Sequence, residues 1–399
     1  MVRPTGGNLT EVVIASACRT PIGKYGRAFR NVEAPRLGAA VIQEAVQRAG
    51  IAPEDVEEVL MGNVLQAGVG QAPARQAALF AGLPDKVGCV TINKVCASGM
   101  KAVAIAADAI RAGSLSVAVA GGMESMSRAP HLVREVRWGV KYGHVEQIDH
   151  MLHDGLWDVY NKYHMGVTAE NIARRFSITR EDQDRFSLES HHRALQATVG
   201  GKFKEEVLPV EGMGKTGAEL ITTDEGIRAD TTLEQLAALQ PAFDPKGTVT
   251  AGNASQLSDG AAALVVMSED AAKERGIKPL ARITAYATSG VRPENIMEAP
   301  IPTVQKLLQR TGQRISDFDL IEHNEAYAAA SLAVMRQLDV PYERFNVHGG
   351  AVALGHPLGC TGARILTTLL YALRDRNGRR GLATLCLGGG NAMAMTLER

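Results

Sequence analysis

The chain has 399 residues, of which 45% are hydrophobic, and its 43 basic and 43 acidic residues cancel. This length and composition predict a globular protein of two or three domains. The balanced charge, with no long run of one sign, argues against nucleic-acid or anionic-membrane partners. No apolar run approaches the roughly 20 residues that span a bilayer, and residues 1–10 lack the apolar core of a secretion signal, so we expect a cytoplasmic protein.

Short β-rich runs alternate with longer helical patterns, which predicts α/β layering around a largely parallel sheet. In the first 125 residues a helix is expected at 35–50, between strands at 11–17, 56–62 and 116–122. The tail repeats the pattern, with strands expected at 280–288, 318–324 and 381–390.

The two ends of the chain resemble each other, which predicts an internal duplication. Residues 49–63 match residues 311–325 at an offset of 262, and residues 121–126 match residues 388–393 at 267, as if five residues had been inserted. Chance similarity of Gly-rich and acidic stretches is the alternative. We expect an N-terminal half of residues 1–127 and 258–277, a C-terminal half of residues 278–399, and an inserted domain of residues 128–257. Within the insertion, Thr168 is the expected N-cap of a helix.

Five cysteines form an odd set without a CxxC pair or a Cys/His cluster at zinc spacing, which argues against disulfides and metal sites. They are Cys18, Cys89, Cys96, Cys360 and Cys386. Free cysteines are mostly small core residues, so each needs a local reason to be considered reactive.

Cys96 has such a reason, because the sequence around it predicts a strand, a tight turn and a helix that ends at Gly113. At a helix N-terminus the helix dipole and free N–H groups favour a thiolate and can lower a cysteine pKa to roughly 3.5–7.5. The pattern fits a nucleophile, with a buried structural cysteine as the alternative.

His356 precedes a Gly-rich turn that opens another amphipathic helix. Adding 262 to the position of Cys96 places the duplicated turn between His356 and Cys360. If the halves pack about a pseudo-twofold axis, His356 approaches Cys96 and can serve as its base. A structural histidine is the alternative.

Two further segments combine a strand end with polar or flexible residues. Cys386 is followed by three glycines, where backbone N–H groups can approach a ligand closely. A dinucleotide-binding loop is the competing interpretation, but no helix and acidic residue follow. Asn324 and Glu325 end an apolar strand, either lining a site or capping a turn.

These motifs together resemble the thiolase family, in particular its short-chain acetoacetyl-CoA thiolases. The resemblance spans nearly the whole chain and is carried in order by RTPIGKYG, TINKVCASGMKA, AGGMESMS, DGLWDVYNKYHMG, GTVTAGNAS, HNEAY, GGAVALGHPLG and CLGGG. It implies two βαβαβαββ halves in a five-layered αβαβα body with an inserted loop domain, assembled as a homotetramer.

The resemblance also implies roles for individual residues. Cys96 matches the acylated nucleophile, His356 the residue that activates it, and Cys386 the acid/base. Asn324 matches a residue that holds a catalytic water. One oxyanion hole would consist of His356 and that water, the other of the backbone N–H groups of Cys96 and Gly388.

The implied reaction is the reversible Claisen condensation of two acetyl-CoA to acetoacetyl-CoA and CoA through an acyl-Cys96 intermediate, without metal or redox cofactor. His164 and Met165 match the short-chain acyl pocket, and Tyr327 is a further expected substrate-binding residue. The expected contacts to CoA are Leu156, Arg228, Phe243, Ala251 and Ser255.

Three features depart from the short-chain pattern: His348 replaces an Asn, Tyr327 replaces a Phe, and GCTGAR resembles degradative thiolases. A degradative 3-ketoacyl-CoA thiolase of broader chain length is therefore an alternative. A decarboxylating condensing enzyme is disfavoured by Cys386, and a non-catalytic CoA-binding scaffold by the intact catalytic set.

Overall fold

The structure is a computed structural model that describes residues 10–214 and 217–399. The expectation about a secretion signal in residues 1–10 therefore lies, except for Thr10, outside the described residues. One sheet runs through the molecule in the order β4-β3-β5-β12-β1-β13-β16-β15-β14, with β2 paired to β12. The strands are β1 Val12–Arg19, β2 Gly23–Lys24, β3 Glu58–Gly62, β4 Gly88–Ile92, β5 Val117–Ser125, β12 Ser258–Ser268, β13 Ala281–Gly290, β14 Leu320–His323, β15 Arg380–Leu387 and β16 Asn391–Glu398.

The strand order is symmetric about the contact between β1 and β13, which supports the duplication. Outward from this joint, β12, β5 and β3 on one side mirror β16, β15 and β14 on the other. The joint itself is narrow, with Val13 opposite Arg282 and Ile14 opposite Ala281.

The expected second offset of 267 is wrong. Gly121 pairs with Met61, and Thr384 pairs with His323, the counterpart of Met61 at an offset of 262. Gly121 thus corresponds to Thr384, not to Gly388, an offset of 263. Gly121 lies inside β5, whereas Gly388 follows the end of β15, so the two Gly-rich runs are not equivalent.

The prediction of a largely parallel sheet is also wrong, because the sheet is mixed. The parallel pairs are β3–β4, β3–β5 and β14–β15. β12 runs antiparallel to both β1 and β5, and β16 to both β13 and β15. Strands that are joined by helical crossovers are expected to be parallel neighbours. Here β12 and β16 lie between such strands and run in the opposite direction.

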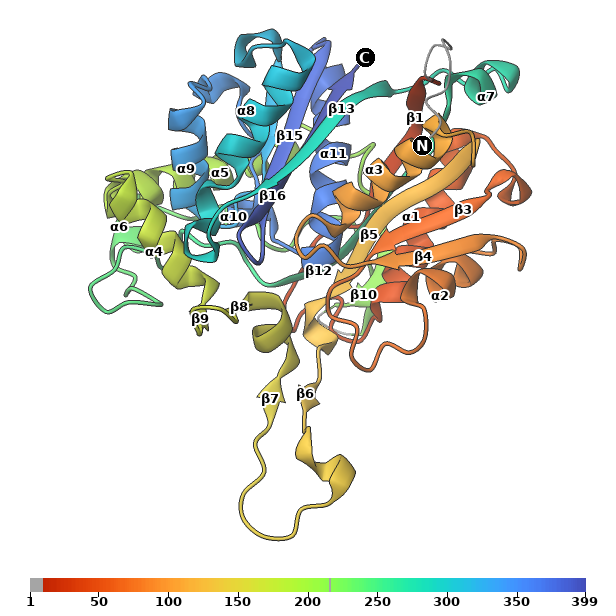
Figure 1. Ribbon diagram of the computed structural model, residues 1–399. Helices are drawn as coiled ribbons and strands as arrows, with labels where there is room; N and C mark the ends of the chain where they lie inside the picture. The colour runs from red at the N-terminus through yellow and green to blue at the C-terminus, as the bar shows by residue number, and fades with distance from the viewer. Residues whose placement is uncertain (1–9, 215–216) are drawn as a thin grey trace.

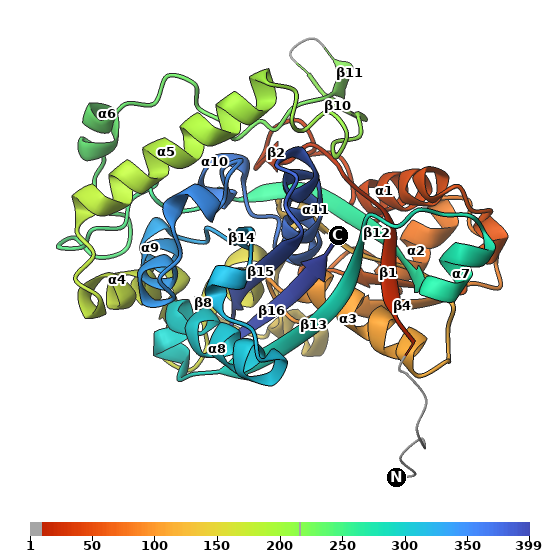
Figure 2. The same cartoon turned by 90° about the horizontal axis from the view of Figure 1, so that it is seen from above.

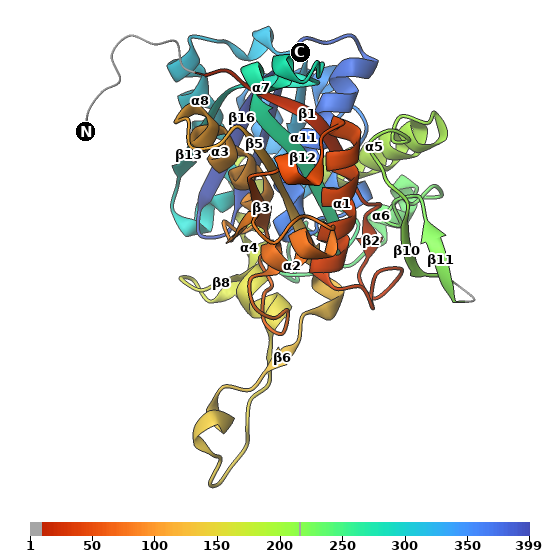
Figure 3. The same ribbon diagram turned by 90° about the vertical axis from the view of Figure 1, so that its right-hand side faces the viewer.

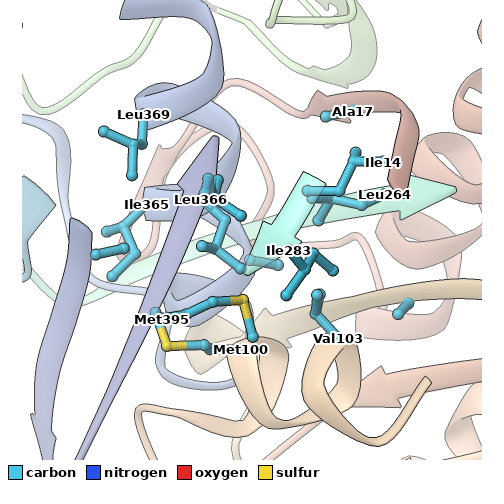
Figure 4. Close-up of a cluster of buried hydrophobic side chains, with 14 of the residues drawn as sticks. Ile14, Ala17, Met100, Val103, Leu264, Ile283, Ile365, Leu366, Leu369 and Met395 are labelled. Atoms are coloured by element: carbon cyan, nitrogen blue, oxygen red, sulfur yellow. The ribbon is translucent and has the colours of Figure 1, made fainter. Parts of the chain in front are cut away.

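Helices and sheet halves form five layers, which confirms the predicted thiolase fold (Figures 1 and 2). The outer face of the N-terminal half is covered by α1 Ala34–Ala49 and α2 Pro73–Phe80, and that of the C-terminal half by α8 Pro300–Thr311 and α9 Ala328–Gln337. Between the halves lie α3 Ser98–Arg111 and α11 Leu358–Asp375. Side chains from both, including Met100 and Leu366, share one core with Ile14 and Met395 (Figure 4).

Residues 128–257 form helices and short hairpins outside this body. The helices are α4 Met165–Arg175, α5 Arg180–Val199 and α6 Leu233–Ala237, and the hairpins pair β6 His131–Leu132 with β7 Ile148–Asp149, β8 Trp157–Asp158 with β9 Tyr163–His164, and β10 Val210–Met213 with β11 Ala218–Ile221. Residues 131–149 project from the body as an arm (Figures 1 and 3).

The start of α4 differs from the prediction. Its N-cap is His164, whose Nδ1 accepts the N–H of Gly166 at 2.9 Å, whereas Thr168 lies inside the helix. A histidine ring nitrogen has replaced the usual oxygen acceptor at the cap, so the composition rule pointed to the wrong residue.

In the described parts of the chain, 10–214 and 217–399, no helix is long and apolar enough to cross a membrane. The same residues contain no group of three or more His, Cys, Asp or Glu side chains arranged to hold a metal ion.

Candidate active site

Cys96 stands in the turn between β4 and α3, two residues before the helix begins. Val95 has a φ of 46°, an unfavourable conformation for a β-branched residue. The Ser98 hydroxyl closes the turn, accepting the N–H of Lys94 at 2.8 Å and donating to the carbonyl of Val95 at 2.6 Å. The turn is thereby locked with Cys96 in front of the helix.

His356 is positioned just before α11, after the short helix α10 Ala351–Leu354. Gly355 has a φ of 113°, and a Cβ there would clash with the Ser258 hydroxyl. The His356 N–H donates to the carbonyl of Gln256 at 3.0 Å. The chain therefore needs glycine before His356 to bring this backbone against the strand that begins at Ser258.

The N-terminal turns of α3 and α11 meet face to face through small residues. A Cβ on Gly99 would lie 2.8 Å from the backbone nitrogen of Ala363, and one on Gly362 would clash with that of Met100. This close approach brings His356 Nε2 within 3.3 Å of Cys96 Sγ.

The C-terminal half adds three further predicted groups. Asn324 follows β14, and its Nδ2 lies 3.3 Å from His356 Nε2. The backbone N–H groups of Gly388 and of Cys96 itself act to lower the pKa of the Cys96 thiol. Cys386 is the penultimate residue of β15, is 2% exposed, and its sulfur lies 3.9 Å from Met297 Sδ.

The protonation states follow from desolvation. Burial, with Arg364 adding to it, lowers the pKa of His356 to about 3. Burial raises the pKa of Cys386 to about 12, and desolvation raises that of Cys96 further, with Cys386 as the next cause. Loss of solvent thus opposes the N–H groups at the helix start, which by themselves favour a thiolate at Cys96. At neutral pH both cysteines are thiols and His356 is neutral.

Two cavities adjoin these groups. The outer one has a volume of about 400 Å³, and the inner one, about 50 Å³, contains Cys96, Cys386 and Gly388 in its lining. Predicted substrate residues in the outer lining are Leu156, His164, Phe243, Ala251, Ser255 and Tyr327. Those in the inner lining are Leu156, Met165, Ser255 and Tyr327. His356 lines both, so the outer cavity opens toward the reactive groups.

Aromatic rings from the insertion and the C-terminal half form one wall of the outer cavity. The His164 ring stacks on Phe243 with centroids 4.5 Å apart, and Phe243 meets Tyr327 edge-on at 6.2 Å. These ring contacts restrict the motion of the three side chains and give the wall a defined shape.

Two predicted features lie elsewhere. Arg228 is not among the described residues that line the two cavities. It is partly exposed, and its backbone N–H donates to His191 Nδ1 at 3.1 Å. His348 is buried with its ring edge-on to Phe203, 5.8 Å between centroids. This departure from the family pattern therefore does not face the substrate cavities.

Several cavity residues were not predicted. Lys24 and Tyr25 line the outer cavity, and both belong to the RTPIGKYG motif, which was a usable signal. Met297, in the 3-10 helix Pro293–Glu298, lines the inner cavity but stands outside every motif. Thr361, whose hydroxyl lies 2.6 Å from His356 Nδ1, stands in the GCTGAR segment but had no assigned role.

Comparison with known proteins gives a consistent family. Residues 12–270 match the thiolase N-terminal domain and residues 277–399 the thiolase C-terminal domain. The chain is 51% identical to an acetyl-CoA acetyltransferase of Cupriavidus necator and 48% identical to a probable acetyl-CoA acyltransferase of Staphylococcus aureus; each alignment covers 98% of this chain and all of the relative. A crystal structure of the Bacillus anthracis acetyl-CoA acetyltransferase superimposes with a TM-score of 0.96 at 44% identity, over 98% of this chain and all of that one. The chain therefore belongs to the thiolase family and is an acyltransferase.

Proposed function

We propose that this enzyme is an acetyl-CoA C-acetyltransferase that condenses two acetyl-CoA to acetoacetyl-CoA and CoA, and catalyses thiolysis in reverse. The observation that carries the proposal is the 3.3 Å approach of His356 Nε2 to Cys96 Sγ beside a second cysteine, Cys386, in one small cavity. The names of the relatives from Cupriavidus necator and Bacillus anthracis support acetyl-CoA as the substrate.

In the first half-reaction, His356 takes the Cys96 proton and the thiolate attacks the acetyl-CoA carbonyl. The tetrahedral intermediate collapses, the bond to the CoA sulfur breaks, and Cys386 donates its proton to the departing CoA thiolate. The products are acetyl-Cys96, free CoA, a His356 imidazolium and a Cys386 thiolate. The protonated resting state of both thiols supports this assignment of protons.

In the second half-reaction, the Cys386 thiolate removes an α-proton from a second acetyl-CoA. The enolate carbon attacks the acetyl group, a C–C bond forms, and the Cys96 thiolate leaves and recovers its proton from the His356 imidazolium. Every proton returns to its starting group. The cycle needs no outside acid or base, which suits a site largely shielded from water.

Two groups of donors stabilise the negative oxygens in this scheme. His356, together with a water held by Asn324, faces the enolate, and the backbone N–H groups of Cys96 and Gly388 face the acyl carbonyl. In support, the Asn324 side chain is fully buried, and its Oδ1 has no hydrogen-bond partner among the described residues. Each such donor is typically worth on the order of 100- to 1000-fold in rate.

The inner cavity supports a preference for short acyl groups. Its volume of about 50 Å³, between Met165, Met297 and Cys386, accommodates little beyond an acetyl unit. A degradative thiolase for longer 3-ketoacyl chains remains the second candidate, because Met side chains are flexible enough to move aside. A rate series from acetoacetyl-CoA to longer and 2-methyl-branched 3-ketoacyl-CoAs separates the two: the proposal expects a fall of at least tenfold with each lengthening.

We also propose that the enzyme acts as a homotetramer in which the arm of residues 131–149 contacts other subunits. The arm exposes Trp138 at 88% and Tyr142 at 101% of their surfaces, which is unusual for a solvated hairpin. Light scattering of a Trp138→Ser, Tyr142→Ser double variant tests this. A lower oligomer is expected, and an unchanged mass would remove the arm from the interface.

The function is tested by separating the roles of the two cysteines. Cys96→Ser should abolish formation of an acyl-enzyme from radiolabelled acetyl-CoA. Cys386→Ser should still become labelled at Cys96 but fail to condense or to exchange α-protons. Cys89→Ser, a partly exposed thiol outside both cavities, is the matched control and should behave as wild type. Full condensation by Cys386→Ser would contradict the proposed mechanism.

A further inference from the structure

The two ring nitrogens of His356 have different polar neighbours, and these neighbours restrict where the imidazole proton sits. Nδ1 lies 2.6 Å from the Thr361 hydroxyl. Nε2 lies 3.3 Å from Cys96 Sγ and 3.3 Å from Asn324 Nδ2. A neutral imidazole carries one proton, so one nitrogen donates and the other accepts.

At the Nδ1 side, the threonine hydroxyl has its own place for a proton. Thr361 Oγ1 is 2.8 Å from the carbonyl oxygen of Pro357, four residues earlier in α11. A carbonyl only accepts, so the hydroxyl proton points there, as in the common back-bond of helical threonines. The lone pairs of Oγ1 then face the ring, and the hydrogen of this 2.6 Å contact belongs to Nδ1.

At the Nε2 side, both neighbours can donate. The Asn324 amide, with Nδ2 toward the ring, and the Cys96 thiol each offer a hydrogen to an unprotonated Nε2. The Nδ1–H tautomer indicated by Thr361 is therefore compatible with both contacts at Nε2.

We propose that Thr361 is a positioning residue that holds His356 as the Nδ1–H tautomer, leaving the Nε2 lone pair directed at Cys96. Thr361 is fully buried and lies in the first turn of α11, so its position is fixed by the helix that also places His356. When His356 takes the Cys96 proton, the Nδ1–H bond to Thr361 stays in place, and no hydroxyl rotation is needed during the reaction.

This inference rests on the proposed function only for its kinetic consequence. The tautomer itself can be observed in the resting protein by ¹⁵N spectroscopy of histidine-labelled enzyme, with the His356 signals assigned by their loss in His356→Gln. Hydrogen bound to Nδ1 is expected in the wild type. Hydrogen bound to Nε2 would overturn the proposal, whatever the activity of the enzyme.

Variants then test whether the hydroxyl matters for the reaction. Thr361→Val keeps the shape but removes the acceptor, so kcat for acetyl-Cys96 formation should fall about 10- to 100-fold, as for other groups that orient a working histidine. KM for acetyl-CoA should stay within about twofold. Thr361→Ser retains the hydroxyl and should recover kcat to within about threefold of wild type.

Thr367 provides the matched control, because it is a fully buried threonine on the same helix. Its hydroxyl makes the same kind of back-bond, to the carbonyl of Ala363 at 3.0 Å. Thr367→Val should change thermal stability about as much as Thr361→Val but leave kcat unchanged. Equal losses of kcat in the two valine variants would reduce Thr361 to a structural residue and reject the proposal.

The two failures are distinguishable. A wild type that shows the Nδ1–H signal but transfers no acetyl group would reject the proposed function and leave the tautomer assignment standing. A wild type that is active with hydrogen on Nε2 would do the reverse. If Thr361→Val does not fold, the wild-type spectrum and the spectrum of Thr361→Ser, which should retain the Nδ1–H signal, still decide the question.

Discussion

The N-terminal turns of α3 and α11 make reciprocal contacts but have different surroundings. Gly99 of α3 faces Ala363, and Gly362 of α11 faces Met100, so the two contacts are related by the pseudo-symmetry of the halves. Yet the start of α11 presses into the N-terminal half. A Cβ on Gly62 would lie 2.7 Å from the carbonyl of Gly359, and one on Gly122 would clash with that same oxygen.

In the C-terminal half the equivalent positions are not glycines, and the inner cavity with Cys96 and Cys386 lies beside them. By strand register Gly62 corresponds to Asn324, and Met123 to Cys386. One half thus carries glycine and methionine where the other carries an amide and a thiol. The two halves provide two equivalent positions for a site. The start of α11 packs closely against the position in the N-terminal half, and this packing places His356 at the position in the C-terminal half.

The largest effect should come from removing the base that α11 contributes. His356→Ala should slow formation of acetyl-Cys96 on the order of 10⁴-fold, because a general base and an oxyanion donor are lost together. Rapid quenching with labelled acetyl-CoA measures this rate. His348→Asn, a buried histidine of the same half outside the cavities, should stay within threefold of wild type. A loss below tenfold in His356→Ala would mean that Cys96 is activated by something else.

A substitution that makes the C-terminal half more like the N-terminal half should reduce the reaction rate less than the loss of His356. Asn324 is the counterpart of Gly62 in the N-terminal half. Asn324→Ala leaves a side chain almost as small as that of glycine, without the extra backbone freedom that glycine would bring. Condensation should fall about 100-fold through the weakened enolate site, while acetylation of Cys96 changes less than tenfold. An equal fall in both half-reactions would place Asn324 in the acyl site instead.

A substitution where the start of α11 packs against the N-terminal half should lower the stability of the protein more than its catalytic rate. In Gly122→Ala the new methyl clashes with Gly359, and the free energy of unfolding should drop by about 1–3 kcal/mol. Gly88→Ala is the control, because its nearest neighbour would be the Glu58 side chain at 3.4 Å, an ordinary contact. Urea denaturation compares the two. If they have equal stability, the contact between α11 and the N-terminal half is not tightly packed.

The last effect concerns pH and accumulates over several pH units. Burial, opposed by Asp375 and aided by Arg376 and Lys202, lowers the pKa of His348 to about 4 from an ordinary value of 6.5. Below pH 6.5 the unfolded chain therefore binds a proton that the folded protein does not, and stability is lost as the pH falls toward 4. Relative to His348→Asn, the wild type should lose about 1.4 kcal/mol per pH unit in this window. Parallel denaturation curves at all pH values would show that His348 titrates normally.

Much of this comparison was predictable from the sequence, because the repeat at 262 residues and the motifs around Cys96 and His356 recur at fixed spacing. The five-layered fold was implied by the resemblance to the thiolase family that these motifs carry. The direction of β12 and β16 did not, since hydrophobic periodicity shows which residues are buried but not which strands pair.

The protonation of Cys96 was also beyond local reasoning. A helix start favours a thiolate, but burial raises the pKa of the Cys96 thiol, and the charge of Cys386, far away in the chain, raises it further. Met297 reaches the inner cavity from a segment with no motif, and Thr361 acquires meaning only once His356 Nδ1 is seen beside it. In each case the information lies in the three-dimensional packing around the site and not in a local sequence pattern.

The position of β1 in the sheet determines how long this strand stays unpaired while the chain is being synthesised. β1 ends at Arg19, yet both of its neighbours, β12 and β13, begin only at Ser258 and Ala281. Residues 20–257 must be synthesised first, which takes roughly 10 to 50 s at the usual rate of synthesis. Throughout that time both edges of this mostly apolar strand lack their partners, so β1 needs protection from aggregation while the chain is being made.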